Sequence, residues 1–332
     1  MRIADIRQRL AGLGAKPTHI ERILRAWMHA RPLDAHDAAH APPQAVLGVL
    51  PGLTLDLHAL ARVQSAHPSE DGSVRLLLEL ADGQTVESVL LARDGLCVST
   101  QVGCAVGCRF CMTGQGGLLR QMGSAEIVAQ VVAARARRVV KKVVFMGMGE
   151  PAHNMDNVLE AIDLLGTAGG IGHKNLVFST VGDRRVFERL PQCRVKPALA
   201  LSLHSTKADL RAQLMPRAPR IEPVELVALA NAYSQATHYP IQYQWTLIEG
   251  VNDGDDELEG IVRLLAGHYA VMNLIPFNEV DGADFRRPEM ARAEAMALHL
   301  HRHGILAKIR NSAGQDVAGA CGQLRARLAA AN

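Results

Sequence analysis

The spacing of hydrophobic positions changes along the chain and divides it into regions of different predicted structure. In residues 1–65, apolar side chains recur at intervals of three and four, which is the period of an amphipathic helix. The clearest stretch follows Lys16-Pro17-Thr18 and has one face made of Ile20, Ile23, Leu24, Trp27 and Met28. A small helical unit is therefore predicted, with an irregular connection rich in Ala, His and Pro at 35–53.

The two regions that follow have strand signals. Apolar runs at 74–80 and 86–92 flank Ala81-Asp82-Gly83, which predicts a β-hairpin. From residue 95 onward, short apolar runs alternate with longer helical patterns. The predicted strands are 96–100, 142–147, 175–180, 198–204, 242–248, 270–275 and 306–310, and the helices begin near residues 124, 155, 184, 207, 223, 255 and 288. This alternation predicts a parallel sheet covered by helices, either barrel-like or doubly wound, with active-site residues at the carboxyl ends of the strands.

Composition narrows the class of protein. The chain has 332 residues, 48% of them apolar and 21% charged, as in ordinary soluble domains. Neither a membrane span nor a signal-peptide core is evident, so a cytoplasmic protein is expected. A net charge of +3 allows a phosphate-bearing partner without requiring one, and an aromatic content of 4% argues against a simple base-stacking platform. In a reducing compartment, six cysteines indicate metal binding or catalysis.

Three of these cysteines form the strongest motif in the chain. Cys104, Cys108 and Cys111 have CxxxCxxC spacing within QVGCAVGCRFCMTG. Thiolates are the usual ligands of iron–sulfur clusters, and three of them leave one iron of a four-iron cluster open to another ligand. The alternative is a structural zinc site with Cys97 as fourth ligand, but zinc modules usually combine two separate knuckles or mix Cys with His. The spacing favours a cluster.

A second motif supports this interpretation. The run VVFMGMGEP at 143–151 has the pattern of a buried strand that ends in a Gly-rich turn with an acidic residue. Such a turn alone is weak evidence. Together with the three-cysteine loop it resembles the radical SAM superfamily. There the open iron binds the amino and carboxylate groups of S-adenosylmethionine (SAM), and a similarly placed turn holds the amino group.

The remaining motifs resemble the RlmN/Cfr family of radical SAM RNA adenine methyltransferases, over nearly the whole length. The matching segments are GAKPTHIERILRAWM, CVSTQVGC, MGMGEP, FSTVG, SLHS, GVND, NLIPFN and ACGQL. The resemblance implies a partial (β/α)6-type radical SAM barrel with an N-terminal helical and β-hairpin appendage. It implies four parts: a helical accessory domain at 1–65, a hairpin extension at 66–94, the barrel at 95–310, and a catalytic-cysteine segment at 311–332.

The resemblance also implies a reaction. One SAM methylates Cys321, and a second SAM at a [4Fe-4S] cluster is cleaved to a 5'-deoxyadenosyl radical that removes a hydrogen from the new methyl group. The carbon radical adds to an adenine, and Cys97 attacks the bridging sulfur, giving a Cys97–Cys321 disulfide and the methylated base. Adenine C2 and C8 are not nucleophilic, so a cofactor-supplied radical route is chemically reasonable. On the residues alone, Cys97 and Cys321 would be read as two small buried side chains.

Residue by residue, the resemblance implies three sets of site residues. The cluster ligands are Cys104, Cys108 and Cys111. The catalytic residues are Cys321, Cys97 and Glu87, with Glu87 as the general base that removes the ring proton. An exposed strand charge is the alternative for Glu87, and a structural buried histidine is the alternative for His204. The implied SAM contacts are Gly149, Glu150, Ser179, Ser202, Leu203, His204 and Asn278.

The chain departs from the family pattern at places where RNA contact is expected. These are Arg217-Ala218, Gln244-Trp245 and the thinned basic stretch Arg310-Asn311-Ser312-Ala313-Gly314. They leave the target nucleotide open, with C2 of adenine favoured over C8. The implied partners are an RNA substrate, either 23S ribosomal RNA or tRNA, and an electron donor such as flavodoxin with its reductase. A monomer is expected, with an appendage that helps to grip RNA.

Two other functions remain alternatives. One is a radical SAM enzyme that acts on a diverged substrate, and the other is a non-enzymatic RNA-binding protein stabilised by zinc or by a cluster. Neither of them needs both Cys97 and Cys321.

Overall fold

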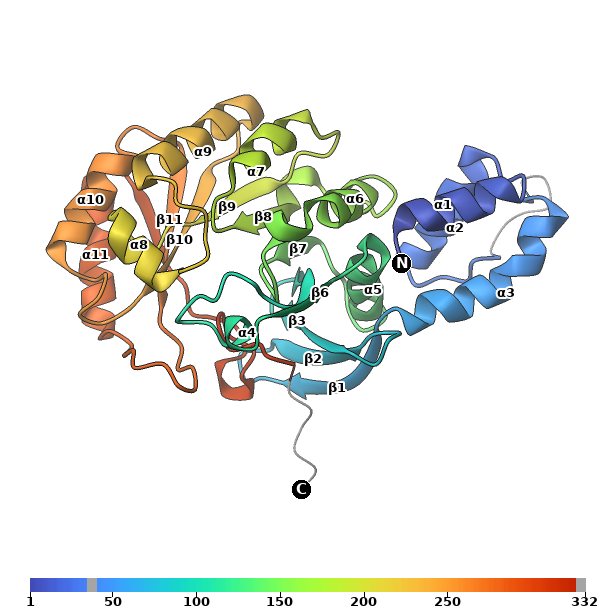
Figure 1. The fold of residues 1–332 in the computed structure, drawn as a ribbon, viewed down its shortest axis with the longest axis horizontal. Coiled ribbons are helices and arrows are strands. Elements are labelled where there is room, and N and C mark those ends of the chain that lie inside the picture. The colour runs from blue at the N-terminus through green and yellow to red at the C-terminus, as the bar shows by residue number, and fades with distance from the viewer. Residues whose placement is uncertain (35–40, 327–332) are drawn as a thin grey trace, which may run out of the picture.

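The computed structural model describes residues 1–34 and 41–326, and its main feature is a long curved sheet with a helical unit at one end (Figure 1). The sheet has 10 strands in the order β1-β2-β3-β4-β7-β8-β9-β10-β11-β12. The antiparallel part consists of β1 (Arg62–Pro68), β2 (Val74–Glu79), β3 (Thr85–Leu91) and β4 (Gly95–Cys97). The parallel part continues from β4 through β7 (Lys142–Phe145), β8 (Leu176–Thr180), β9 (Ala198–Ser202), β10 (Ile241–Leu247), β11 (Ala270–Pro276) and β12 (Leu306–Ile309).

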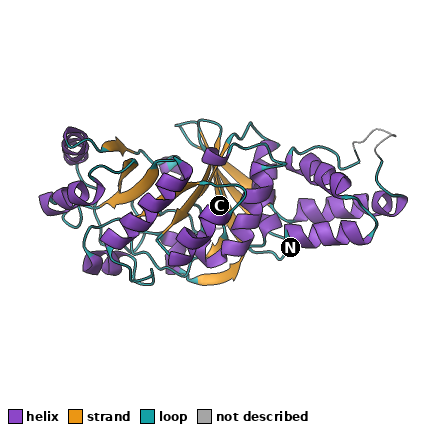
Figure 2. Ribbon diagram, turned by 90° about the horizontal axis from the view of Figure 1, so that it is seen from above, coloured by secondary structure: helices purple, strands orange, loops and turns teal. Residues whose placement is uncertain are grey.

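Helices connect the parallel strands and cover their outer face, so the strands are enclosed when the molecule is seen from above (Figure 2). They are α5 (Ser124–Arg135), α6 (Met155–Gly166), α7 (Arg184–Arg189), α8 (Ala208–Leu214), α9 (Pro223–Thr237), α10 (Asp255–Leu265) and α11 (Met290–Arg302). Short 3-10 turns are η2 (Pro151–Asn154), η3 (His173–Asn175), η4 (Leu190–Gln192) and η5 (Gln315–Val317). Strand residues that face the helices are fully buried, whereas the concave face has a small apolar group that includes Val177, Ala198 and Ala200. The prediction of an α/β fold with parallel strands in a partial barrel covered by helices is confirmed.

The N-terminal unit consists of α1 (Ile3–Gly12), α2 (Pro17–Met28) and α3 (Gln44–Ala59). The predicted apolar face of α2 is buried along its length. The irregular connection predicted at 35–53 is wrong from residue 44 onward, because α3 continues through Pro51. Its apolar residues Val46, Leu50, Leu53 and Leu57 recur at helical intervals, and their burial outweighs the helix-breaking tendency of one proline. Residues 35–40 lie outside the described part.

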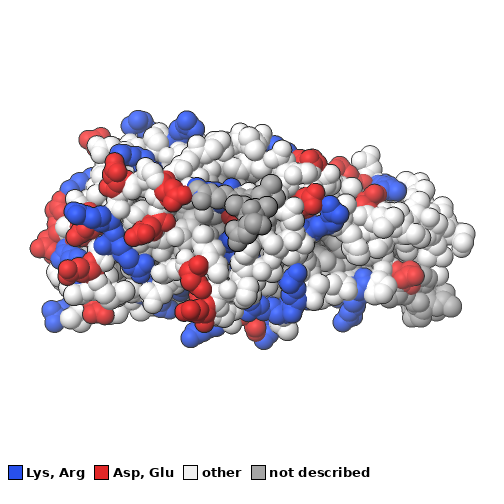
Figure 3. All heavy atoms as spheres, turned by 90° about the horizontal axis from the view of Figure 1, so that it is seen from below, with Lys and Arg blue, Asp and Glu red and all other residues white. Residues whose placement is uncertain are grey.

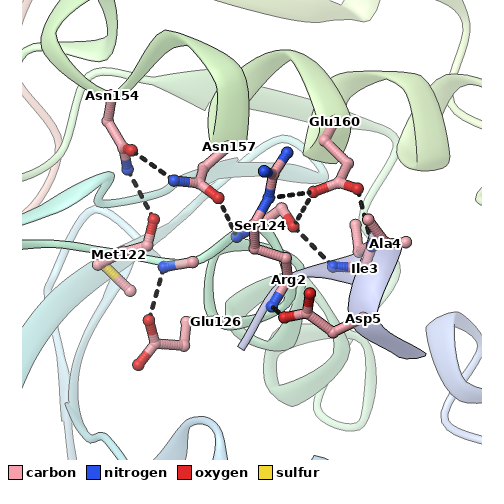
Figure 4. A network of polar contacts seen from close by, with 11 residues as sticks. Arg2, Ile3, Ala4, Asp5, Met122, Ser124, Glu126, Asn154, Asn157 and Glu160 are labelled. Carbon is pink, nitrogen blue, oxygen red and sulfur yellow. Dashed lines mark hydrogen bonds and ion pairs between the residues drawn. The ribbon is translucent and has the colours of Figure 1, made fainter. Parts of the chain in front are cut away.

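A network of polar contacts fixes the N-terminal unit to α5 and α6 (Figure 4). The backbone N–H of Ile3 donates to the Ser124 hydroxyl at 2.8 Å, and the N–H of Ala4 donates to a Glu160 carboxylate oxygen at 2.8 Å. Ser124 itself donates to Glu160. From Ser124 the network continues through Asn157 to Asn154, whose amide donates to the backbone oxygen of Thr100 at 2.8 Å. One hydrogen-bonded chain therefore links the N-terminal unit to the segment that follows β4.

Some predicted boundaries differ from the observed ones. The predicted division at residue 65 falls inside β1, which is an additional strand and pairs with β2 through a β-bulge. The strand predicted at 96–100 leaves the main sheet after Cys97, because the chain turns to form β5 (Gln101–Gly103), which pairs with β6 (Leu118–Gln121) in a separate small sheet. Between β5 and β6 lies the short helix α4 (Met112–Gln115). Among the described residues, no helix combines the length and apolarity needed to cross a bilayer.

Candidate active site

The three-cysteine loop lies between β5 and α4 and is held mainly by backbone contacts. The N–H of Cys104 donates to the carbonyl of Gly117 at 2.9 Å, and the N–H of Arg109 donates to the carbonyl of Leu214 at 3.0 Å. Gly103 has φ +80°, and a Cβ added there would lie 2.0 Å from the Gly117 carbonyl oxygen. Only a residue without a side chain permits this approach, so Gly103 fixes the entry into the loop.

The three thiols lie near one another, and each is partly shielded from solvent. Burial raises the pKa of Cys104 to about 12, and the charges of Glu150 and Cys111 act in the same direction. Burial also raises the pKa of Cys108, as do the charges of Cys111 and Cys104. Three mutually repelling thiolates in one loop suit a cationic iron–sulfur centre, whose binding deprotonates its ligands. Within the part of the chain that the structure describes, no three His, Cys, Asp or Glu side chains are grouped as they would be around a single metal ion.

The Gly-rich turn after β7 is packed against the start of the loop. Gly149 has φ +103°, and an added Cβ would lie 2.6 Å from Cβ of Gln101. The backbone N–H of Glu150 donates to the Gln101 side-chain oxygen at 2.7 Å. The Glu150 carboxylate accepts from the N–H groups of Ala152 and Val181, both at 3.0 Å. Burial raises the pKa of Glu150 to about 7, so this carboxylate is held in place but partly protonated near neutral pH unless a cation lies beside it.

The other predicted SAM contacts lie at the carboxyl ends of neighbouring strands, as the fold predicts. Ser179 is on β8, Ser202 ends β9, and Leu203 follows with its N–H bonded to the carbonyl of Gln244 at 3.1 Å. Asn278 follows β11 and donates to the Ser312 hydroxyl at 2.9 Å and to the Cys321 carbonyl at 3.0 Å. Its side-chain oxygen is buried without a partner among the described residues, which leaves one acceptor open at the site.

His204 has the structural features of a fixed, neutral side chain. Its Nδ1 accepts from the N–H of Thr246 at 2.9 Å, and its ring lies 4.8 Å from the ring of Phe110 in the three-cysteine loop. Its backbone has φ +59°. Burial lowers the pKa of His204 to about 3, helped by the charge of Arg211. His204 therefore supports the cysteine loop by packing, whatever else it contacts.

The C-terminal segment crosses from β12 back to the antiparallel strands and brings Cys321 to the loop. The N–H of Met112, the first residue of α4, donates to the carbonyl of Gly322 at 2.6 Å. Cys321 is exposed when the whole residue is considered, but its thiol is buried. This burial raises the pKa of the Cys321 thiol, and the charge of Cys111 raises it further. Burial raises the pKa of Cys97 to about 12, and the charge of Cys321 raises it further. The thiols of Cys97 and Cys321 thus lie within electrostatic range of each other, Cys321 lies within the same range of Cys111 in the three-cysteine loop, and all six cysteines are free thiols.

Glu87 is buried on β3, so the alternative of an exposed strand charge is wrong. Its carboxylate forms an ion pair with Arg75 and accepts from the backbone N–H groups of Arg325 at 2.8 Å and Ala326 at 3.0 Å. These contacts tie the end of the C-terminal segment to the sheet.

Two residues of the site were not predicted from the sequence. Arg211 on α8 is 3% exposed and donates to the carbonyls of Val181 and Ser202. Burial lowers the pKa of Arg211 to about 10, opposed by the charges of Cys108 and Glu150, so a buried cation lies between the cysteine loop and the Gly-rich turn. The other residue is Gln101, which connects that turn to β5. An Arg seven positions after SLH and a Gln inside CVSTQVGC are ordinary in isolation, and only the fold shows what they touch.

The departures from the family pattern lie in different environments. Arg217 is exposed and donates to the carbonyl of Ala105 in the cysteine loop at 3.3 Å. Gln244 faces the concave side of the sheet, whereas Trp245 is fully buried with its indole N–H bonded to the carbonyl of Asn252 at 3.2 Å. The expectation that RNA meets this whole dipeptide is therefore wrong for Trp245, which belongs to the core. Cys193 lies away from these groups and donates to the carbonyl of Arg189 at 3.3 Å.

The fold, the three-thiol loop and the Gly-rich turn define a class of enzyme. The family model of the radical SAM superfamily matches residues 98–265, and the chain belongs to that superfamily. Membership implies a [4Fe-4S] cluster and SAM as cofactors.

Similar proteins indicate a narrower class within this superfamily. The chain is 71% identical over 330 residues to a protein of Azoarcus sp. strain BH72 named "Probable RNA methyltransferase", covering 99% of this chain and 95% of the relative. A protein of Pseudomonas aeruginosa PAO1, also named "Probable RNA methyltransferase", is 66% identical, and the match covers 98% of this chain and 96% of the relative. The crystal structure of a radical SAM methyltransferase from Sphaerobacter thermophilus has a TM-score of 0.84 at 35% identity, covering 98% of both chains.

Proposed function

We propose that this protein is an RNA adenine methyltransferase of the RlmN/Cfr kind. It methylates C2 of an adenine, with C8 as the alternative, in 23S ribosomal RNA or tRNA. The observation that carries the proposal is that the thiols of Cys97 and Cys321, which are far apart in the sequence, lie within electrostatic range of each other, where the Gly322 carbonyl is bonded to Met112 at the end of the three-cysteine loop. The names of the relatives support RNA as the substrate.

Each group of residues has a distinct proposed role. Cys104, Cys108 and Cys111 hold the cluster, which when bound supplies the electron that cleaves SAM. Glu150 and the open acceptor of Asn278 suit the positively charged amino group of SAM. The remaining contacts to SAM come from the strand ends, namely Gly149, Ser179, Ser202, Leu203 and His204.

The two outlying cysteines perform the group transfer. The Cys321 thiol accepts a methyl group and then links that carbon to the adenine. The Cys97 thiolate attacks the Cys321 sulfur and a disulfide forms. The bond between that sulfur and the transferred carbon breaks, and the carbon keeps the bonding electron pair and takes up a proton to become the methyl group of the base. Both thiols have raised pKa values, so the reaction needs a local base or cation, and Arg310 lowers the pKa of Cys321.

Glu87 is proposed to take the proton from the adenine ring. Its carboxylate is held by Arg75 and two backbone N–H groups, which fix its position for the proposed proton transfer. The same contacts anchor residues 325 and 326, so the proposed base and the end of the C-terminal segment are held together.

The remaining proposals concern partners. The electron donor is a flavodoxin-type protein, the enzyme works as a monomer in the cytoplasm, and the helical unit α1–α3 helps to grip RNA. A deletion that tests this last role must end at Leu60, because removal of residues 1–65 would cut into β1. It should weaken RNA binding and leave SAM cleavage intact.

One experiment separates the candidate functions. Protein purified and reconstituted without oxygen is mixed with strong reductant, SAM and total RNA, and the nucleosides are analysed by mass spectrometry against 2-methyladenosine and 8-methyladenosine standards. The proposal predicts 5'-deoxyadenosine together with one methyladenosine. 5'-deoxyadenosine without methylated RNA would favour a diverged substrate. A colourless zinc-loaded protein that releases none would overturn the enzymatic proposal.

A further inference from the structure

A group of three basic residues lies on the concave face of the parallel sheet, outside the residues used in the proposed reaction. Lys142 is the first residue of β7. Side chains alternate between the two faces of a strand. Val143 is fully buried toward the helices, whereas Val144 belongs to the apolar group of the concave face. Lys142 therefore shares the concave face with Val144.

The other two members come from β12 and the residue that follows it. Ala307 is buried in the core together with α11, so Lys308 and Arg310 face the concave side, and both are exposed. In the sheet, β7 and β12 are separated by β8, β9, β10 and β11, and only curvature brings their side chains together. Besides burial, the charges of Arg310 and Lys308 lower the pKa of Lys142, so the three lie within electrostatic range of one another.

These three residues have no acidic partners in the described ranges 1–34 and 41–326. None of them makes an ion pair or a side-chain hydrogen bond with any residue of those ranges. On the face shown in Figure 3, by contrast, basic side chains are interspersed with acidic ones. Three like charges that repel one another across a concave surface cost folding free energy. An arrangement of this kind is suited to an anion that arrives from solution.

The register of the strands connects this group to the proposed SAM site. Ser202, Gln244, Asn273 and Lys308 are aligned in one row across β9, β10, β11 and β12. The row begins at a proposed SAM contact, passes two amide side chains and ends at the basic group. At the same end of the row, the positive charge of Arg310 lowers the pKa of the Cys321 thiol. An anion held by the three cations thus lies within electrostatic range of the thiol proposed to bond the base.

We propose that Lys142, Lys308 and Arg310 bind a backbone phosphate of the RNA, at the nucleotide whose base reaches Cys321 or at its neighbour. This inference rests on the proposed function and adds to it the contact that positions the strand. A phosphate contact requires no base recognition, and cations on side chains of different lengths can follow a flexible single strand.

The test uses the full-length reconstituted protein and a single-stranded adenosine-containing oligoribonucleotide with a fluorescent label. In the double variant K142Q/K308Q, the affinity at about 0.1 M salt should fall about tenfold. The slope of log Kd against log salt should decrease by about 0.7 for each phosphate that the variant no longer neutralises. Iron content should not change. The thermal midpoint should stay equal or rise, because repulsion is relieved.

Two further variants serve as controls. R263Q removes one exposed cation from the outer helix α10 and should bind as the unmodified protein does. K308R retains the charge and should retain both affinity and salt slope. Equal weakening in R263Q would contradict a specific site, and so would an unchanged affinity and slope in K142Q/K308Q.

The design separates failure of this inference from failure of the proposed function. If the unmodified protein methylates RNA while K142Q/K308Q binds it normally, the phosphate site is wrong and the function stands. If the unmodified protein binds RNA through these cations but never methylates it, the site stands and the function is wrong. If it neither binds nor methylates RNA, both are overturned.

Discussion

The two cysteine-bearing regions of the site are held in place by different kinds of contact. The three-cysteine loop is fixed by backbone hydrogen bonds to nearby segments and by the close approach of Gly103 to Gly117. The C-terminal segment that carries Cys321 is held largely by side chains of the distant antiparallel strands and of the turn between β1 and β2. The Arg75 guanidinium donates to the Val317 carbonyl at 2.6 Å, and the Asp71 carboxylate accepts from the N–H of Gly314 at 3.0 Å.

This difference between backbone and side-chain contacts is consistent with the function proposed for each region. Cluster ligands must keep fixed positions, and a loop held by its backbone opens only at high free energy. The Cys321 sulfur has to meet a methyl donor, an adenine and Cys97 in turn. A segment held by a few side-chain contacts can shift among these partners when single contacts break.

The largest effect on iron content should follow removal of one of the proposed cluster ligands. In Cys108→Ala, two thiolates cannot hold a four-iron cluster, so iron should fall from about four atoms per chain to near zero. Iron analysis and visible absorption measure this. The matched control is Cys193→Ala, whose thiol lies away from the loop and should retain full iron. Full iron in Cys108→Ala would contradict the ligand assignment.

The next effect should come from disturbing the backbone that holds the loop. In Gly103→Ala, the new Cβ would lie 2.0 Å from the Gly117 carbonyl oxygen, at φ +80°. We expect a loss of roughly 3 kcal/mol in unfolding free energy, together with poor iron loading. Gly116→Ala is the control, because nothing lies within 4 Å of its added Cβ. Chemical denaturation of both variants would show whether the loop tolerates a side chain at residue 103.

A moderate effect is expected where the C-terminal segment is anchored. Arg75→Gln leaves the buried Glu87 carboxylate without its cation and removes the bond to Val317, which should cost about 2–3 kcal/mol. Iron content should remain normal, whereas amide hydrogen exchange in 312–326 should accelerate. Arg62→Gln breaks an exposed ion pair with Glu79 on the same sheet and should cost under about 0.5 kcal/mol. Loss of iron in Arg75→Gln would show that the three-cysteine loop depends on the contacts that anchor the C-terminal segment, contrary to the comparison.

The smallest effect concerns Asp71 and pH. Partial burial raises the pKa of this carboxyl, but hydrogen bonds from Ser73, Gly314 and Ser69 outweigh it and hold the pKa at about 2. Because the folded-state pKa lies below the ordinary value, the contribution to stability is present above that value and is lost as pH falls toward about 2. Asp71→Asn should speed exchange of the 314–319 amides about two- to fivefold at neutral pH. The difference from the unmodified protein should shrink in acid.

Local motifs were predictable from the sequence, and contacts between distant segments were not. The CxxxCxxC loop and the Gly-rich turn depend on residues adjacent in the chain, and alternating apolar runs placed the barrel strands. By contrast, the burial of Glu87 depends on Arg75 and on the backbone of residues 325 and 326. The basic group of Lys142, Lys308 and Arg310 forms only because the sheet curves. No spacing along the chain encodes that curvature.

Cys97 and Cys321 are proposed to act as a pair next to the three-cysteine loop. The most direct test uses Cys97→Ala protein, reconstituted without oxygen and mixed with SAM, strong reductant and adenosine-containing RNA. Without the Cys97 thiolate, the bond between Cys321 and the base cannot be resolved. Mass spectrometry should therefore detect RNA covalently joined to the peptide that contains Cys321, at up to about one adduct per chain. Repeated turnover to free methylated RNA, with no adduct, would contradict the account.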